Sequence, residues 1–275
     1  MLASEIHYPE TVQDLVEQLR RRPEAVVYAG GTEILRRQSA THARLPREVL
    51  CVAGMTELRQ VLLTERFVEI GAAVTLAEIL ELRENAVPEL LALSLKGVAN
   101  PAIRNLATIG GNLASTSRFM DSWPALACLD AMVELRDADG ARWVNVNRLV
   151  APDGSPDFPR SNLLTRIRLP MEGWDFVAFR KIGIKDYPSR ASAAFAFATR
   201  VDKGILSEFR LAFAGEAALR QRDIEGMIVG RRLPLERKQA AAFAAEYRQA
   251  AEILPIRQRH QFGTLVEGAL DLLSR

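Results

Sequence analysis

The chain has 275 residues, and its 36 basic and 34 acidic side chains leave a formal net charge of +2. Hydrophobic residues make up 48% of the sequence and charged residues 25%, which excludes a disordered or fibrous chain. The balanced charge argues against nucleic acid as the main partner. This length allows one large domain or two smaller ones, each with its own buried core.

The chain contains only two cysteines, Cys51 and Cys128, each within an apolar stretch. Two thiols cannot supply the four ligands of an iron–sulfur cluster or a structural zinc site. They could form one disulfide, but two buried free thiols in a reducing cytosol are the simpler interpretation. The three histidines are dispersed, so the sequence predicts no metal site. Without a secretory leader or a membrane-length apolar run, we expect a cytoplasmic protein.

The first half of the chain alternates patterns typical of helices and strands. Thr11 and Asp14 resemble a capping box with a shorter acid, at the start of an amphipathic segment. Predicted helices cover residues 11–22, 75–82, 88–96 and 121–129. Predicted strands cover residues 25–29, 48–53, 67–72, 132–136 and 142–146, the last two joined by a turn at 137–140.

The pattern changes after a loop rich in proline, glycine and aspartate at residues 150–161 and a strand at 163–169. Three further strands are predicted at residues 176–182, 192–201 and 205–214. They have no long helices between them, so we expect an antiparallel sheet. Helical patterns dominate from residue 227 onward, with helices predicted at 236–252 and 262–273. We therefore predict a domain boundary near residue 171.

Two glycine pairs stand out: Gly30-Gly31, directly after a predicted strand, and Gly110-Gly111. A glycine pair allows a sharp turn with positive φ, and successive free N–H groups there can bind an anion. A helix beginning just after such a loop favours phosphate. Two such loops could hold one diphosphate from two sides, although either pair alone could be a plain turn. The standard G-x-G-x-x-G dinucleotide fingerprint does not occur.

Charged residues later in the chain also allow two interpretations. Asp121 could simply cap the following helix. Arg180 and Lys181 could be solvated charges on an alternating strand.

Three segments, taken together, resemble a known family. They are AGGTEIL at 29–35, IGAAVTLAEI at 70–79 and NPAIRNLATIGGNLASTSRFMDSWPALACLDAMVEL at 100–135. They resemble the FAD-binding (medium) subunit of molybdenum hydroxylases, the family of xanthine dehydrogenases and aerobic carbon monoxide dehydrogenases. The resemblance extends over most of residues 5–215. It is most specific at I-R-N-x-A-T-I-G-G-N, followed by an aspartate and D-A-x-V-E-L.

The resemblance implies an α+β fold in two domains. Residues 1–170 would form an FAD-binding domain of the vanillyl-alcohol-oxidase (PCMH) type, with two α/β subdomains at about 1–55 and 56–170. Residues 171–275 would form a C-terminal domain with an antiparallel three-stranded sheet and helices. The boundary predicted from the residue patterns agrees with this division.

The resemblance also implies which residues contact FAD. Backbone amides of the first loop would hold the diphosphate, and the second loop would approach it from the other side. Asp121 would contact the polar part of the cofactor, Ala99 and Ile103 would line the flavin pocket, and Leu164 and Lys181 would touch the adenine or isoalloxazine end. Arg180 could replace its neighbour Lys181 in that role. The two loops comprise Ala29, Gly30, Gly31, Thr32 and Glu33, and Thr108, Gly110, Gly111, Asn112 and Ser115.

The sequence departs from the family after Lys181. Many relatives carry an arginine doublet where this chain has Ile184-Lys185. This departure concerns the electron acceptor and the partner surface more than the FAD site. Tyr187 could lie near the flavin ring or be an ordinary loop residue.

The resemblance implies an electron-transfer role. This chain would take electrons from the [2Fe–2S] clusters of a small partner subunit and pass them to NAD, a quinone or another acceptor. A large molybdopterin-binding subunit would oxidise the substrate. Because the redox chemistry belongs to FAD, we predict no catalytic acid or base in this chain. The alternatives are a self-contained flavin oxidoreductase and a cofactor-free scaffold subunit.

Overall fold

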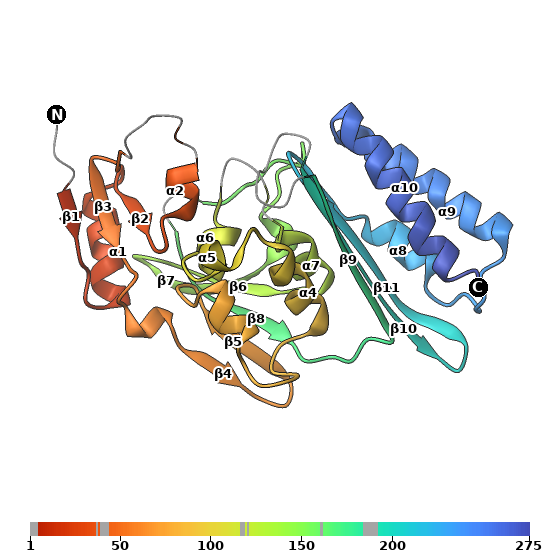
Figure 1. The fold of residues 1–275 in the computed structure, drawn as a ribbon, viewed down its shortest axis with the longest axis horizontal. Helices are drawn as coiled ribbons and strands as arrows, with labels where there is room; N and C mark the ends of the chain where they lie inside the picture. Colours follow the sequence, from red (N-terminus) through yellow and green to blue (C-terminus); the bar gives the residue numbers. More distant parts are fainter. Residues whose placement is uncertain are drawn as a thin grey trace.

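The computed structural model describes residues 5–36, 38, 44–115, 119, 121–159, 162–183 and 192–275. Three sheets follow one another along the molecule, and helices lie between the second and the third (Figure 1). The chain begins beside the first sheet and ends beside the last helices (Figure 1). Each sheet packs on its own hydrophobic core.

The first sheet is parallel, with strand order β1-β3-β2. Its strands are β1 (Glu5–His7), β2 (Val26–Tyr28) and β3 (Glu48–Cys51). The helix α1 (Val12–Arg21) packs on this sheet through the apolar face that the sequence predicts. The Thr11 side chain accepts the Asp14 amide at 3.1 Å, but the Asp14 carboxylate accepts the Glu10 amide instead of that of Thr11. The short acid therefore completes only half of the predicted capping box.

The second sheet is antiparallel, with strand order β4-β5-β8-β6-β7, and the predicted hairpin joins β6 to β7. Its strands are β4 (Val61–Leu63), β5 (Phe67–Gly71), β6 (Met132–Asp137), β7 (Gly140–Asn145) and β8 (Leu163–Pro170). Five helices connect β5 to β6 and pack on this sheet. They are α3 (Leu76–Leu80), α4 (Glu89–Gly97), α5 (Pro101–Arg104), α6 (Ile109–Leu113) and α7 (Trp123–Cys128).

The third sheet is antiparallel, as predicted, with strand order β12-β11-β10-β9. It contains the three predicted strands and a short fourth one: β9 (Phe176–Ile182), β10 (Ala193–Asp202), β11 (Ile205–Ala214) and β12 (Ala218–Leu219). The helices α4 and α7 contact one face, and α8, α9 and α10 cover the other (Figure 1). These last helices are α8 (Arg222–Ile228), α9 (Arg237–Ala250) and α10 (Ile256–Leu272).

Two C-terminal helices begin earlier than the sequence predicts. α8 starts at Arg222 and α10 at Ile256. The sequence does not predict these first turns, because exposed charged residues interrupt the apolar pattern in each of them. An amphipathic pattern shows a helix only where it turns an apolar face to the core, so polar first turns escape detection. Among the residues that the structure describes, no helix combines the length and apolar character needed to cross a membrane.

The helix α7 lies inside the molecule. All six of its residues are buried, and it contacts both β10 and β11. A helix that is apolar on every side fits a position between two packed layers. Cys128 ends this helix and is a buried free thiol, as the simpler interpretation of the sequence expects, whereas Cys51 is a free thiol that is only partly buried.

Burial raises the pKa of the Cys128 thiol well above its ordinary value. Because the thiolate is the reactive form, we expect Cys128 to resist alkylation in the folded protein, whereas the partly exposed Cys51 reacts first. Labelling with iodoacetamide at mildly alkaline pH, followed by peptide mass spectrometry, measures both rates. Unfolding in urea should equalise them, and equal rates in the native protein would contradict the burial of α7.

Candidate cofactor site

The first glycine pair lies between β2 and α2 (Thr32–Arg36). Gly31 has a φ of +67°, in the left-handed region that favours glycine. A Cβ placed on Gly30 would lie 1.6 Å from the carbonyl oxygen of Leu106. The first loop therefore rests directly on the backbone that leads into the second loop. Within the described part of the chain, the amides of Gly30 and Gly31 donate no hydrogen bond.

Thr32 and Glu33 of the first loop form the start of α2, whereas Ala29 precedes the glycine pair and packs half-buried against the core of the first sheet. Glu33 pairs with Arg36 one turn later, with Nε of the arginine 2.7 Å from Oε2 of Glu33. This carboxylate is therefore neutralised on its own helix, which removes a negative charge from the neighbourhood of the free amides. Thr32 is the first residue of α2, so its hydroxyl lies next to the Gly31 turn.

The second glycine pair lies within α6, and its two members serve different purposes. A Cβ on Gly110 would lie 2.6 Å from Cβ of Ala72, so this glycine lets α6 pack against the chain that follows β5. Gly111 is exposed, and the Oγ1 of Thr108 is the one described atom that its Cβ would approach within 4 Å. Gly110 is thus needed for packing, whereas Gly111 leaves open space beside the loop.

The expectation of free amides does not hold for the second loop. Every first-turn amide of α6 has a partner in the chain: Ile109 with Val74 O at 3.0 Å, Gly110 with Ala72 O at 2.9 Å, Gly111 with Thr108 Oγ1 at 3.1 Å and Asn112 with Thr108 O at 2.9 Å. The backbone after β5 presents carbonyls that need donors once buried, and α6 supplies them. A ligand at this loop would meet the Thr108 hydroxyl and the exposed backbone of Gly111.

Asp121 and Lys181 form an ion pair beside the second loop. Nζ of Lys181 lies 2.6 Å from Oδ2 of Asp121, and the side chains are only 12% and 14% exposed. The same ammonium group donates to the carbonyl oxygen of Gly97 at 3.3 Å, at the end of α4. The hydroxyl of Ser122 donates to Oδ1 of Asn112 at 2.5 Å, which ties this pair to α6.

These contacts argue against the simpler interpretations of Asp121 and Lys181 that the sequence leaves open. Ser122, not Asp121, occupies the N-cap position of α7, so capping is not the role of the Asp121 carboxylate. Lys181 is paired and largely buried, whereas its neighbour Arg180 is exposed and donates to Phe179 O. Successive side chains of a strand point to opposite faces, so only one of these two cations can turn toward α4 and α7.

Ala99 and Ile103 lie on either side of the start of α5, and both are half-buried at the edge of the central core. Ala99 has a φ of +39°, which is uncommon for a residue with a side chain. The guanidinium of Arg104 holds this turn by donating to Val98 O at 2.8 Å and to Ala99 O at 3.2 Å.

Four of the predicted residues are buried, Thr108 and Gly110 in the second loop and also Ser115 and Leu164. Leu164 is 5% exposed and lies in β8 opposite Leu135, with its side chain in the central core. Ser115, just beyond α6, is 6% exposed. Ile184-Lys185 and Tyr187 lie outside the described residues.

Most of the predicted residues thus lie along one series of contacts. The series runs from Gly30 to the segment before Thr108, through α6 to Ser122, and through the Asp121–Lys181 pair to the turn at Ala99. Sequence reasoning missed the residues that join these parts: Gly97, Leu106 and Ser122. Gly97 could have been singled out in the sequence, because it is a glycine shortly before the motif that starts at Asn100. The structure explains that glycine: a Cβ there would lie 2.8 Å from Cε1 of Phe179.

Comparison with known proteins decides the family. Residues 2–172 match the family described as the FAD binding domain in molybdopterin dehydrogenase. This chain belongs to that family. It is 30% identical over 212 residues to the xanthine dehydrogenase FAD-binding subunit of Escherichia coli O157:H7, covering 75% of this chain and 72% of the relative. It is 29% identical over 248 residues to the nicotine 6-hydroxylase medium subunit of Paenarthrobacter nicotinovorans, covering 86% and 83%.

Solved structures share the fold. The structure of carbon monoxide dehydrogenase from Hydrogenophaga pseudoflava matches with a TM-score of 0.83 at 23% identity, covering 98% of this chain and 96% of that chain. The resemblance seen in the sequence is confirmed. The chain is an oxidoreductase flavoprotein subunit of the xanthine dehydrogenase type, its cofactor is FAD, and its fold contains the PCMH-type domain.

The residues along the contact series fit FAD. Gly30 and Gly31 offer free amides beside a neutralised Glu33, as a diphosphate requires. Gly111 leaves open space where a side chain would project. The largely buried Asp121–Lys181 pair and the half-buried Ala99 and Ile103 offer polar and apolar groups, as the two ends of a flavin require.

We expect Gly30→Ala to destabilise the protein, since its new methyl group would overlap the backbone carbonyl of Leu106. Overpacking of this kind lowers Tm by roughly 5 °C or more. Gly111→Ala is the matched control, because its methyl group meets only Thr108 Oγ1, at 3.0 Å, and should leave Tm nearly unchanged. Thermal unfolding of the FAD-free protein by circular dichroism measures both. A Gly30→Ala variant as stable as wild type would contradict the contact between the loops.

Proposed function

We propose that this chain is the FAD-carrying electron-transfer subunit of a multi-subunit molybdopterin-dependent dehydrogenase. It takes electrons from the [2Fe–2S] clusters of a small partner subunit and passes them to NAD or another acceptor. A large molybdopterin-binding subunit oxidises the substrate. The names of the two relatives, a xanthine dehydrogenase FAD-binding subunit and a nicotine 6-hydroxylase medium subunit, support a role within such an assembly.

We also propose two functional domains, an FAD-binding domain at residues 1–170 and a C-terminal domain at 171–275. Two observations support the boundary. The family match ends at residue 172, and the sheet that follows β8 is antiparallel with its own aromatic core. Lys181 would then be a contribution of the second domain to a site built mainly by the first.

The observation that carries the proposal is the ion pair between Lys181 and Asp121, with both side chains largely buried. An isolated buried charge is costly, so this pair persists because each partner neutralises the other and Gly97 O accepts a further hydrogen bond. The pair ends a series of contacts that starts at the glycine loop of β2. A long, two-ended ligand with a charged centre matches such an extended site.

Each part of the chain has a separate task in this proposal. FAD, when bound, exchanges electrons either singly or in pairs, which suits a carrier between clusters and NAD. The amides of Gly30 and Gly31 hold the diphosphate, with the Thr32 and Thr108 hydroxyls as further donors. Lys181 and Asp121 orient the polar end of the flavin, and Ala99 and Ile103 exclude water from its apolar face. No residue of this chain needs to move a proton.

The two alternatives have less support. A cofactor-free scaffold disagrees with membership of a family defined by FAD binding. A self-contained oxidoreductase needs a substrate site of its own. The residues of the candidate cofactor site are all engaged in the contact series or assigned to FAD. Turnover of an organic substrate by the isolated chain would revive that alternative.

Gly111→Asp tests where the diphosphate binds. The new side chain enters open space, so the protein should fold, but its charge lies beside the proposed diphosphate. We expect FAD to bind about tenfold more weakly or worse, since a like charge nearby costs on the order of 1 kcal/mol or more. FAD titration followed by fluorescence measures the affinity, with one FAD per wild-type chain expected.

Gly173→Asp is the matched control for this experiment. Gly173 lies in the exposed segment between β8 and β9, and a Cβ there meets no described atom within 4 Å. It adds the same charge to the same chain but far from the proposed diphosphate, so FAD affinity should not change. Equal affinities in the two variants would refute the loop assignment.

Lys181→Met tests the ion pair at the other end of the site. Loss of the ammonium leaves the Asp121 carboxylate largely buried and unpaired, and we expect FAD to bind about tenfold more weakly. Arg180→Met, one residue earlier, removes an exposed cation and should leave FAD affinity unchanged. The same titration compares them. A larger effect at Arg180 than at Lys181 would show that the flavin meets the other face of β9.

A further inference from the structure

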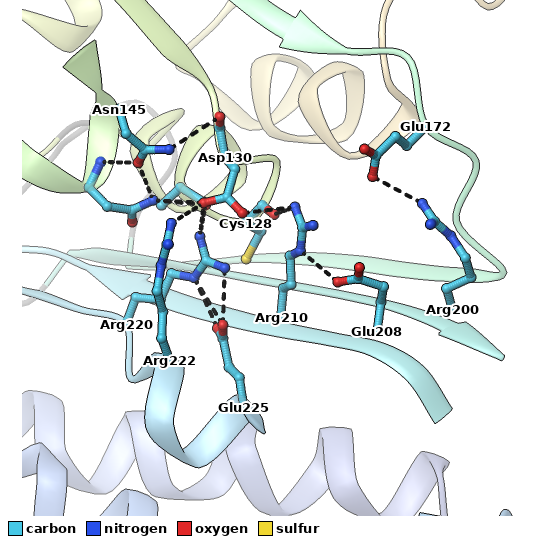
Figure 2. Close-up of polar contacts among 12 residues, drawn as sticks. Cys128, Asp130, Asn145, Glu172, Arg200, Glu208, Arg210, Arg220, Arg222 and Glu225 are labelled. Carbon is cyan, nitrogen blue, oxygen red and sulfur yellow. Dashed lines mark hydrogen bonds and ion pairs between the residues drawn. The ribbon is translucent and has the colours of Figure 1, made fainter. Parts of the chain in front are cut away.

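A second polar cluster lies at the opposite end of α7 from Asp121. Asp130 follows α7, and three guanidinium groups converge on its carboxylate (Figure 2). Nη1 of Arg210 lies 3.1 Å from Oδ2, and Nη1 of Arg220 lies 2.7 Å from Oδ1. Arg222 also pairs with Oδ1. Arg210 belongs to β11 and Arg222 begins α8, so one carboxylate beside α7 holds the third sheet and the helix behind it.

The same arginines bind the end of α7 directly. Arg210 donates to Cys128 O at 3.0 Å, and Arg220 donates to Ala127 O. These carbonyls belong to the C-terminal turn of the helix, where the backbone lacks internal partners. The third sheet is thus fastened both to the Asp130 side chain and to the backbone of α7.

The cluster is internally neutral. Arg220 is 5% exposed, and its Nε lies 3.0 Å from Oε1 of Glu225, which is 7% exposed. Glu208 accepts from Arg210 at 3.2 Å. Three carboxylates therefore balance three guanidinium groups, and Asp130 receives all three cations at once (Figure 2). Because all three guanidinium groups are paired with carboxylates, the cluster connects two layers of the fold and is not suited to bind an anion from outside.

The faces of the third sheet explain why such a joint is needed. The face toward α8, α9 and α10 carries large side chains, among them Phe197, Phe209 and Phe213. On the opposite face, β10 and β11 carry small side chains toward α7, namely Ala196, Ala198, Ala212 and Ala214, whereas Val177 and Phe179 of β9 pack beside α4. Large side chains interlock and fix the position of two layers, whereas a flat alanine surface lets them slide. Polar contacts therefore help to set the position of β10 and β11 on α7, together with the packing of β9 on α4.

The strand register shows that these contacts lie at the two ends of α7. Lys181 lies opposite Ala194, which lies opposite Ala214, and Arg210 is four residues from Ala214 on β11. At about 3.3 Å per residue, the two contacts are about 13 Å apart along the sheet. The helix α7 has six residues and is about 9 Å long at 1.5 Å per residue, and two turn residues at each end carry the chain to Asp121 and to Asp130. One end of α7 holds Lys181, and the other holds the arginines.

We propose that Asp130 is a positioning residue of the FAD site that acts through α7. By fixing the third sheet at the far end of α7, it keeps β9 where Lys181 reaches Asp121 and Gly97 O. The proposal rests on the function proposed above for Lys181, and it assigns Asp130 no contact with FAD.

Asp130→Asn tests the proposal, because it keeps the shape of the side chain and removes the charge that attracts three arginines. We expect faster amide hydrogen exchange in β9 of the FAD-free protein and about fivefold weaker FAD binding. Asp137→Asn is the matched control, since Asp137 also pairs with an arginine, Arg142, but on the β6–β7 hairpin. It should change neither exchange in β9 nor FAD affinity.

A double-mutant cycle with Lys181→Met separates positioning from a general structural role. If Asp130 acts through Lys181, the loss of FAD affinity caused by Asp130→Asn should disappear once Lys181 is methionine. Additive losses would overturn the proposal, as would unchanged exchange in β9. If Asp130→Asn does not fold, Arg222→Gln removes only the most exposed of the three arginines and takes its place with the same expected outcomes.

The exchange measurement keeps this proposal distinct from the proposed function. It uses the protein without FAD, so a wild-type chain that binds no FAD would refute the function while the exchange of β9 still decides the role of Asp130.

Discussion

The ion pair between Lys181 and Asp121 joins two parts of the chain that fold around separate cores. Asp121 belongs to the helices of the central sheet, and Lys181 belongs to the sheet that follows. Neither charge would be stable in its half-buried place without the other. The carbonyl of Gly97 accepts a hydrogen bond from the same ammonium group, and the turn at Ala99 follows two residues later. The site for FAD therefore depends on how accurately two layers meet.

The helix α7 determines how the central layer and the third sheet pack against each other. It is apolar on all sides, and it packs on alanines of β10 and β11, so its own packing holds the layers together but constrains their relative position only weakly. Charges at its two ends supply the missing direction: Asp121 with Lys181, and Asp130 with three arginines. Apolar packing thus provides most of the stability, and polar contacts help to set the relative position of the two layers.

The sequence predicted the elements with strong apolar periodicity and the glycine loops, because these depend on local spacing. It could not distinguish Lys181 from Arg180, since both alternate along one strand and only the packing of β9 on α4 and α7 decides which is buried. Likewise the amide of Gly110, expected to be free, donates to the carbonyl of Ala72 after β5, a contact between distant segments, and that of Gly111 donates to the Thr108 hydroxyl. The roles of Leu106 and Asp130 come from tertiary contacts that no local pattern records. The short strands β1, β4 and β12 carry too few residues to show a period.

The central claim is that FAD spans the contact series from the first glycine loop to the third sheet. A crystal structure of this chain with FAD tests it most directly. The account predicts the diphosphate at the amides of Gly30 and Gly31, beside the exposed Gly111, and the flavin ring within contact of the Asp121–Lys181 pair. Density for the diphosphate away from both glycine loops, or a flavin ring with no contact to the third sheet, would contradict it.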